Sequence, residues 1–175
     1  MGLVPILSKE LDPRLITVRR GGTLTDERHV LLAKWVVLCV EHVLPLFEQE
    51  QPSDPRPREA INVGRAWVRG EVRVGDVHQV AFATNAAACG LGGAVKFAAL
   101  AAGQAVAVAH VAVHDLGAAA YAIRAACASA PVDETGAARV RELGWQRDQI
   151  PVEVRDLVLD DQRRRSAICW NVFDD

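Results

Sequence analysis

Apolar residues recur along this chain at intervals of three and four, and alanine dominates the middle of it. From Ala86 to Ala128, 19 of 43 residues are alanine, with valine, leucine, glycine and two histidines between them. Alanine has the highest helix propensity and almost no side chain, so such a stretch favours helices that approach one another closely. The pattern predicts an all-α protein, a compact helical bundle of about six to seven helices around an alanine-rich central hairpin.

A first long helix is predicted from Asp26 to Phe47. Thr25 can cap its N-terminus, and the acidic residues of its first turn favour the helix dipole. Pro45 falls in the last turn, where a proline kinks or ends a helix. One apolar stripe at three- and four-residue steps is expected to face the core: Leu31, Trp35, Leu38, His42 and Leu46. Residues 1–22 are predicted to form an irregular N-terminal arm, and residues 23–175 a single helical domain.

A linker that contains several prolines separates this helix from a second one, predicted from about Pro57 to Arg69. Asp54 can cap this helix, and Gly70 ends it. The spacing predicts an inner face formed by Ala60, Gly64 and Trp67. The opposite side carries a polar stripe formed by Arg58, Asn62, Arg65 and Arg69.

Glycines and prolines separate the remaining helices. A third helix begins near Val74 and is interrupted at residues 90–93, because each glycine costs a helix about 1 kcal/mol relative to alanine. The helix resumes from Ala94 to Ala102, and Gly103 is predicted to separate it from a central helix over residues 104–129. Two last helices are predicted over residues 134–149, with Val140, Leu143 and Trp145 inward, and 151–158.

Charge and the length of apolar runs limit the classes of partner. The formal net charge is −2, so no overall field attracts nucleic acid or an anionic membrane. Spanning a bilayer takes about 20 mostly apolar residues, and polar residues interrupt the alanine-rich stretch at short intervals. The first residues lack the basic and apolar regions of a secretory signal. We therefore expect a cytoplasmic protein that binds neither nucleic acid nor membrane.

Histidines are the first candidates for chemistry. His110 and His114 are four residues apart, which on one helix places them on the same face, where they can bind one metal ion. A third ligand could come from His42, Glu41 or His78. The zincin pattern H-E-x-x-H is absent, and histidines in an alanine-rich core are more commonly hydrogen-bonded packing residues. We expect no cofactor, and keep a metal site at His42, His110 and His114 as the alternative.

The segment Asp54-Pro55-Arg56-Pro57-Arg58-Glu59 is the second candidate. Two arginines held by prolines beside carboxylates can clamp an anionic group through paired hydrogen bonds. The alternative is an exposed capping loop whose surface ion pairs contribute less than about 1 kcal/mol each. The chain has no G-x-S-x-G elbow, Walker motif or dinucleotide-binding fingerprint, so nucleophilic catalysis and nucleotide binding have little support.

Four blocks of residues occur in order along the chain. They are Arg19-Arg20-Gly21-Gly22-Thr23-Leu24, the helix that ends Glu41-His42-Val43-Leu44-Pro45-Leu46-Phe47, the segment 54–61 with Ala66-Trp67, and the segment 109–114 with Ala119-Ala120-Tyr121-Ala122. Together they resemble the bacterial Imm-5-like putative immunity protein family. The resemblance implies an all-helical cytoplasmic protein that binds and neutralises a toxin, and it brings no catalytic residues.

Two functions of different classes therefore remain open. The first is a non-catalytic immunity protein, or antitoxin, that binds a cognate toxin through a polar surface formed by Arg56, Arg58, Glu59, Asn62, Arg65 and Arg69. The second is a small helical metal-dependent enzyme or ligand-binding protein that uses the histidines. A structural helical protein that forms a homodimer through exposed alanine-rich surface is a third interpretation.

Overall fold

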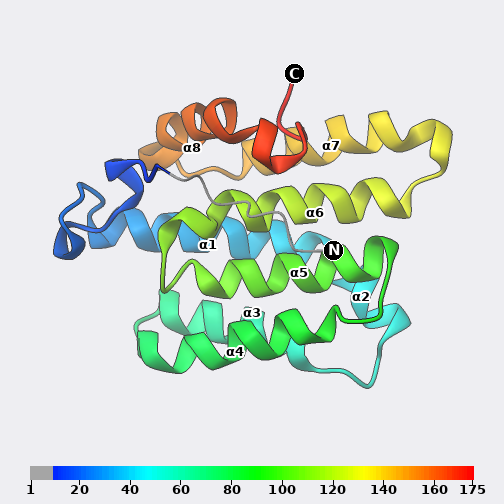
Figure 1. Ribbon diagram of the computed structural model, residues 1–175, viewed down its shortest axis with the longest axis horizontal. Coiled ribbons are helices and arrows are strands. Elements are labelled where there is room, and N and C mark those ends of the chain that lie inside the picture. Colours follow the sequence, from blue (N-terminus) through cyan, green and yellow to red (C-terminus); the bar gives the residue numbers. More distant parts are fainter. Residues whose placement is uncertain (1–9) are drawn as a thin grey trace.

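The computed structural model of this protein describes residues 10–175, and α-helices are the main regular structure of this part (Figure 1). Its eight α-helices are α1 (Asp26–Val43), α2 (Pro45–Glu50), α3 (Arg56–Val68), α4 (Val74–Ala87), α5 (Gly93–Ala107), α6 (Asp115–Ser129), α7 (Thr135–Asp148) and α8 (Val152–Arg165). Short 3₁₀ turns lie between some of them, including Ala112–His114 before α6. The predicted all-α fold is confirmed.

The helices lie side by side in layers along the long axis of the molecule (Figure 1). α7 and α8 form one outer layer, α3 and α4 form the opposite one, and α1, α5 and α6 lie between them. α5 contacts α1, α3, α4 and α6, and α6 also contacts α1 and α7. The alanine-rich hairpin of α5 and α6 is thus the centre of the bundle, as its composition predicts.

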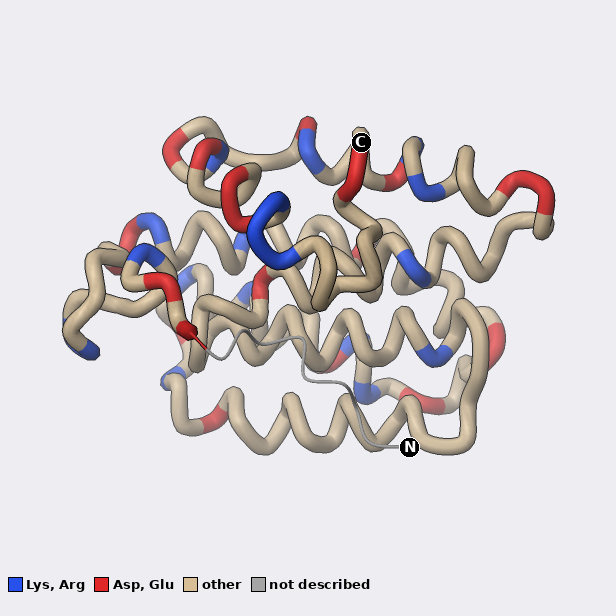
Figure 2. The backbone as a smooth tube through the Cα atoms, turned by 45° about the horizontal axis from the view of Figure 1, so that its top comes forward, with Lys and Arg blue, Asp and Glu red and all other residues tan. Residues whose placement is uncertain are grey.

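Small side chains let the two hairpin helices pack closely. Alanines of both helices are at most 2% exposed: Ala98, Ala99, Ala101, Ala102 and Ala105 in α5, and Ala118, Ala119, Ala120, Ala122 and Ala125 in α6. Charged residues are rare in this region, since Lys96 and Asp115 are the only ones between Asp76 and Arg124. Figure 2 accordingly shows long uncharged runs in the bundle, whereas red and blue segments are frequent on α7 and α8.

The break between α4 and α5 lies where the glycines predict it. α4 ends at Ala87 and α5 begins at Gly93. Gly90 and Gly93 have φ angles of 76° and 57°, in the left-handed region that favours glycine. The glycines at residues 90–93 therefore separate two antiparallel helices and do not merely kink one.

The predicted break at Gly103 is wrong. α5 continues through this residue to Ala107, and α6 begins only at Asp115. Gly103 is buried, and a Cβ there would lie 2.2 Å from Oδ1 of Asn85 in α4. Glycine at this position permits a close contact between two helices. Its low helix propensity destabilises α5 but is not enough to end the helix.

The predicted inner stripe of α1 is correct only in part. Trp35 is fully buried, but Leu38 and His42 are exposed, and the fully buried side chains include Leu32, Val36 and Val40. The reason is that α1 contacts α3, α5, α6 and α8, so neighbours cover more than one of its faces. A helix that is covered on several sides buries more than one face, so a single apolar stripe does not predict which of its residues are buried.

The stretch Asp26–Glu50, which comprises α1 and α2, is long and apolar enough to cross a membrane by length and composition alone. A buried core helix meets the same criterion, and 56% of its most apolar window is buried within the bundle. Pro45 starts α2, so the predicted change of helix at this proline is confirmed.

Between residue 10 and the start of α1 the chain forms no α-helix. Of the predicted arm, residues 1–9 lie outside the described part, and residues 13–20 contain two 3₁₀ turns. An isolated bridge pairs Thr17 with Leu24, and Gly21 makes the turn between them with a φ of 87°. The side chain of Thr25 accepts the backbone N–H of Arg28 at 3.3 Å, so the predicted N-cap of α1 is confirmed.

Two predictions for the C-terminal helices are wrong in detail. Val140 of α7 is 59% exposed, whereas Leu143 is buried as predicted, together with the polar Glu142 and Gln146. These two polar side chains hydrogen-bond each other, at 2.9 Å from Gln146 Nε2 to Glu142 Oε1, which makes their burial possible. α8 continues to Arg165 and does not end at Val158 as predicted.

Candidate functional site

α3 carries the polar stripe that was predicted as a partner-binding surface. Ala60, Ile61 and Gly64 are buried on its inner side, and a Cβ at Gly64 would lie 3.2 Å from the side chain of Val37 in α1. This packing turns the opposite side of the helix to the outside. The residues exposed there are Glu59, Asn62, Arg65 and Arg69.

Carboxylates of α1 and α2 hold two arginines of α3. Arg58 donates through Nε and Nη2 to the two carboxylate oxygens of Glu48, at 2.7 and 2.8 Å. Arg65 Nη2 donates to Glu41 Oε2 at 2.5 Å, and Arg58 Nη1 lies 3.8 Å from Glu41 Oε1. The hydrogen bonds from Arg58 lower the pKa of Glu48, so this carboxylate is ionised at neutral pH. Three helices thus share one network of charges.

The arginines at the two ends of α3 pair with carboxylates close to them in the sequence. Arg56 Nε and Nη2 donate to Asp54 at 2.8 and 2.5 Å, and these hydrogen bonds lower the pKa of Asp54. Asp54 also accepts the backbone N–H of Arg56 at 3.1 Å, which fixes the turn just before α3, although the N-cap residue itself is Pro55 and not Asp54 as predicted. Arg69 makes a similar double contact with Glu71, at 2.7 Å for each hydrogen bond. An anion bound at this loop would have to share or displace these partners.

Glu59 and Asn62 complete the stripe. Both are exposed, and within residues 10–175 neither has an ion pair or a side-chain hydrogen bond. The side chains of Arg58 and Arg65 keep 40% and 49% of their surface exposed despite their pairing. The surface therefore presents guanidinium, carboxylate and amide groups, several of them fixed in position by the helices beneath.

The three candidate metal-binding histidines have different surroundings. His42 Nδ1 lies 2.8 Å from Oε2 of Glu142 in α7, and its ring stacks on Trp145 with centroids 3.9 Å apart. Glu142 is only 5% exposed. The pair joins residues 100 positions apart, so no spacing in the sequence could have indicated it.

His110 and His114 are not stacked on one helix as predicted. His110 lies in the turn after α5 and His114 in the 3₁₀ turn before α6, because the chain reverses between these helices. Both line a cavity of about 150 Å³ together with His78 and Gln104. His114 Nδ1 donates to Gln104 Oε1 at 2.8 Å, and the rings of His78 and His110 meet edge to face with centroids 5.2 Å apart.

Burial favours the neutral form of the imidazoles of His110 and His114. It lowers the pKa of His114 to about 4, and it also lowers the pKa of His110, with Arg20 and His78 contributing. Among residues 10–175 no group of three or more His, Cys, Asp or Glu side chains is arranged to hold a metal ion. The metal hypothesis therefore has no ligand cluster to build on in this part of the chain.

Sequence analysis missed a buried ion network between α6 and α8. Arg165 donates to Asp115 Oδ1 at 2.8 Å, to Asp161 Oδ1 at 2.8 Å and to the backbone carbonyl of Val113 at 2.8 Å. The three charged side chains are at most 5% exposed. Burial raises the pKa of Asp115 to about 6. The separation of 50 residues between Asp115 and Arg165 explains why no motif indicates the network.

Comparison with known proteins identifies the family of this chain. No curated protein and no solved structure matches it. A family model, described as an Imm-5 like putative immunity protein, matches residues 22–153, which contain helices α1 to α7 and the whole polar stripe of α3. The chain therefore belongs to the Imm-5 like putative immunity protein family.

Proposed function

We propose that this protein binds a cognate bacterial toxin in the cytoplasm and neutralises it. The binding surface in this proposal is the α3 stripe, which comprises Arg56, Arg58, Glu59, Asn62, Arg65 and Arg69. Family membership supports a role in immunity and, in general terms, a toxin as the partner. The choice of surface rests on the structure of α3 and its neighbours.

The charge network across α1, α2 and α3 is the observation that carries this choice. Ordering a long side chain on binding costs about 0.5–1.5 kcal/mol, so side chains fixed beforehand favour affinity. Arg58 is held by Glu48 and Arg65 by Glu41 before any partner arrives. Arginine is also among the residues that contribute most strongly to protein interfaces.

Non-catalytic binding is sufficient to neutralise a toxin when the bound protein covers the toxin's active site. A stable interface buries about 800 Å² on each partner, contributed by about 20–30 residues. The α3 stripe is the centre of such an area, and adjoining parts of α1 and α2 extend it. Glu59 and Asn62, which have no partner of their own within residues 10–175, are free to meet groups of the toxin.

The experiment uses the full chain and the toxin candidates encoded beside its gene. Dissociation constants are measured by titration calorimetry, and protection is measured as growth of cells that express the toxin. We expect Asn62→Trp, which places a bulky side chain on the stripe, to weaken binding at least about tenfold, or about 1.4 kcal/mol. Arg65→Ala removes the contact with Glu41 and is expected to weaken binding as well.

Arg141→Trp is the matched control, because Arg141 is exposed on α7, in the opposite outer layer. This variant should bind and protect like the wild-type protein. If Asn62→Trp and Arg65→Ala also bind like wild type, another surface recognises the toxin. If the wild-type chain binds none of the neighbouring gene products and protects against none, the proposed function is wrong.

A further inference from the structure

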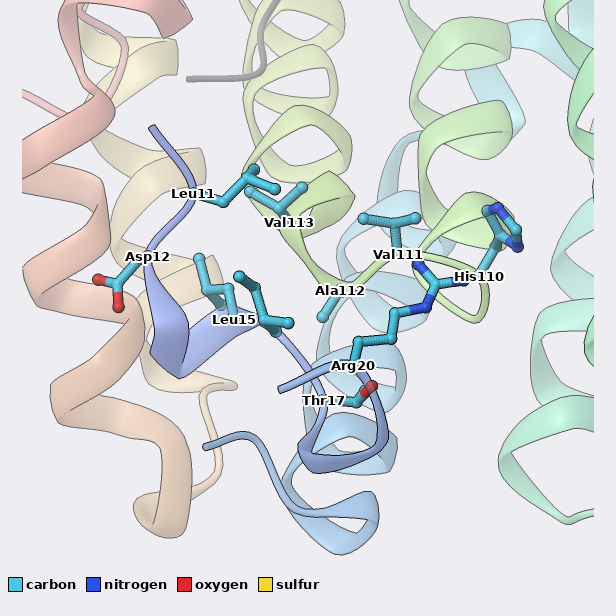
Figure 3. A pocket seen from close by; sticks show the side chains of 10 residues that line it. Leu11, Asp12, Leu15, Thr17, Arg20, His110, Val111, Ala112 and Val113 are labelled. Atoms are coloured by element: carbon cyan, nitrogen blue, oxygen red, sulfur yellow. The ribbon is translucent and has the colours of Figure 1, made fainter. Parts of the chain in front are cut away.

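A second cavity, of about 270 Å³, lies between residues 11–20 and the turn that joins α5 to α6 (Figure 3). Its walls are mainly aliphatic: Leu11, Leu15, Ile16, Val111, Ala112 and Val113. Ligand cavities in proteins are commonly about 300–1,000 Å³, apolar, and equipped with a few polar groups that orient the ligand. The volume here lies just below that range, which limits the cavity to a small ligand.

Arg20 supplies a positive charge at one end of this cavity. Its side chain extends from the 3₁₀ turn Val18–Arg20 toward His110 (Figure 3). Arg20 is exposed and, within residues 10–175, has no ion pair and no side-chain hydrogen bond. Its neighbour Arg19 differs, because it donates to Asp26 at 2.8 Å. An arginine without a partner beside an apolar cavity is positioned to receive an anion.

The carboxylate that lines the cavity is already compensated. Asp12 accepts hydrogen bonds from Arg14 Nη2 at 2.6 Å and from Arg164 Nη1 at 2.9 Å. The hydrogen bonds from Arg14 lower the pKa of Asp12 to about 2. Its negative charge is therefore balanced by two other arginines, and the charge of Arg20 is not neutralised from this side.

His110 adds a polar group next to Arg20. Burial and the nearby charge of Arg20 lower the pKa of its imidazole, which is neutral at pH 7 and can donate one hydrogen bond. A negative group between Arg20 and His110 would remove the unfavourable interaction that an imidazolium experiences there. Toward the other end, Leu15, Val111 and Val113 offer contact to a hydrocarbon group, and the only carboxylate among the described residues there, that of Asp12, is already paired.

We propose that this cavity binds a small carboxylate that carries a short apolar chain. The carboxylate accepts hydrogen bonds from Arg20 and His110, and the chain lies among Leu15, Val111 and Val113. An ammonium compound with a hydrocarbon chain of the same length is repelled by the positive charge of Arg20 and does not bind. The site does not involve the α3 stripe, so the proposal is independent of toxin binding.

Hexanoate, hexylamine and hexanol are the probes, since they share a chain and differ in the charge of the head group. Binding is followed by NMR on the full chain, through the methyl resonances of the aliphatic walls and the imidazole of His110. We expect hexanoate to shift these resonances in a saturable manner with a dissociation constant in the millimolar range. Hexylamine should cause no saturable change. Bound hexanoate should also raise the pKa at which His110 titrates.

Arg20→Gln and Arg19→Gln are the matched variants, because both residues are exposed in the same 3₁₀ turn. Arg20→Gln should weaken hexanoate binding about tenfold, and Arg19→Gln should leave it unchanged. Equal effects of the two variants would contradict the proposal. Equal binding of hexanoate, hexanol and hexylamine, shifts confined to other parts of the molecule, or no saturation with hexanoate would each contradict it as well.

Discussion

At the scale of single residues, His114 and Asp115 are neighbours whose titrations affect stability in opposite directions. The pKa of His114 is about 4 in the folded protein and about 6.5 when unfolded, so the unfolded state takes up the proton first as pH falls. This lowers the free energy of unfolding between pH 6.5 and 4. Asp115 has a folded pKa of about 6 against about 3.9 unfolded, so its protonation favours the folded state over nearly the same range.

We predict that Asp115→Asn makes the loss of stability on acidification steeper. The variant lacks the carboxyl group that offsets protonation of His114 in the unfolded state. The difference in slope should approach one proton, or about 1.4 kcal/mol per pH unit, between about pH 4 and 6. Urea unfolding at several pH values measures it. The exposed Asp148→Asn serves as control, and parallel curves for Asp115→Asn and wild type would disprove the offset.

At the scale of helices, the contact between α4 and α5 shows how one glycine can have two opposite effects. Gly103 lowers the helix propensity of α5 by about 1 kcal/mol relative to alanine. It also makes room for Asn85, whose Oδ1 is buried and has no hydrogen-bond partner among residues 10–175. Periodicity and propensity therefore predicted that helices lie here, but they could not show that this glycine belongs to a helix interior.

We predict that Gly103→Ala destabilises the protein by about 1–2 kcal/mol, because the steric conflict with Asn85 exceeds the gain in helix propensity. Asn85→Ala removes the conflicting oxygen. The double variant Gly103→Ala with Asn85→Ala should therefore be at least as stable as Asn85→Ala alone. Free energies of unfolding in urea give the coupling between the two positions, and additive effects would contradict the contact.

At the scale of the whole molecule, α8 is an integral part of the core. The family model ends at residue 153, near the start of this helix. Arg165 nevertheless reaches between Asp115 and Asp161, and Arg124 of α6 lies over the ring of Trp170, with 4.2 Å from its guanidinium carbon to the ring centroid. The last 22 residues therefore help to hold the central hairpin in place.

We predict that Arg165→Met lowers the free energy of unfolding by about 3–5 kcal/mol at pH 7, because it leaves two buried carboxylates without a cation. Arg163→Met is the matched control two residues earlier. Arg163 is 71% exposed and contacts Asp160 at 3.3 Å, so its loss should change stability by less than about 0.5 kcal/mol. Urea unfolding of both variants tests this, and similar values for the two would show that α8 is peripheral.

Sequence patterns alone were enough to predict the helical class, the cap at Thr25, the breaks at Pro45 and residues 90–93, and the polar outer side of α3. These features depend on interactions between residues close together in the sequence. They can therefore be predicted from the spacing of apolar residues and from the helix propensity of each residue type. The partners of His42, Gly103 and Arg165 became known from the folded chain, because these contacts join residues on different helices. The cavity beside Arg20 belongs to the second group, since its walls come from the arm and from the turn between α5 and α6. A local sequence pattern does not show which distant surfaces pack together. This packing determines which side chains are buried and which hydrogen-bond partners they have, and each candidate site depends on both.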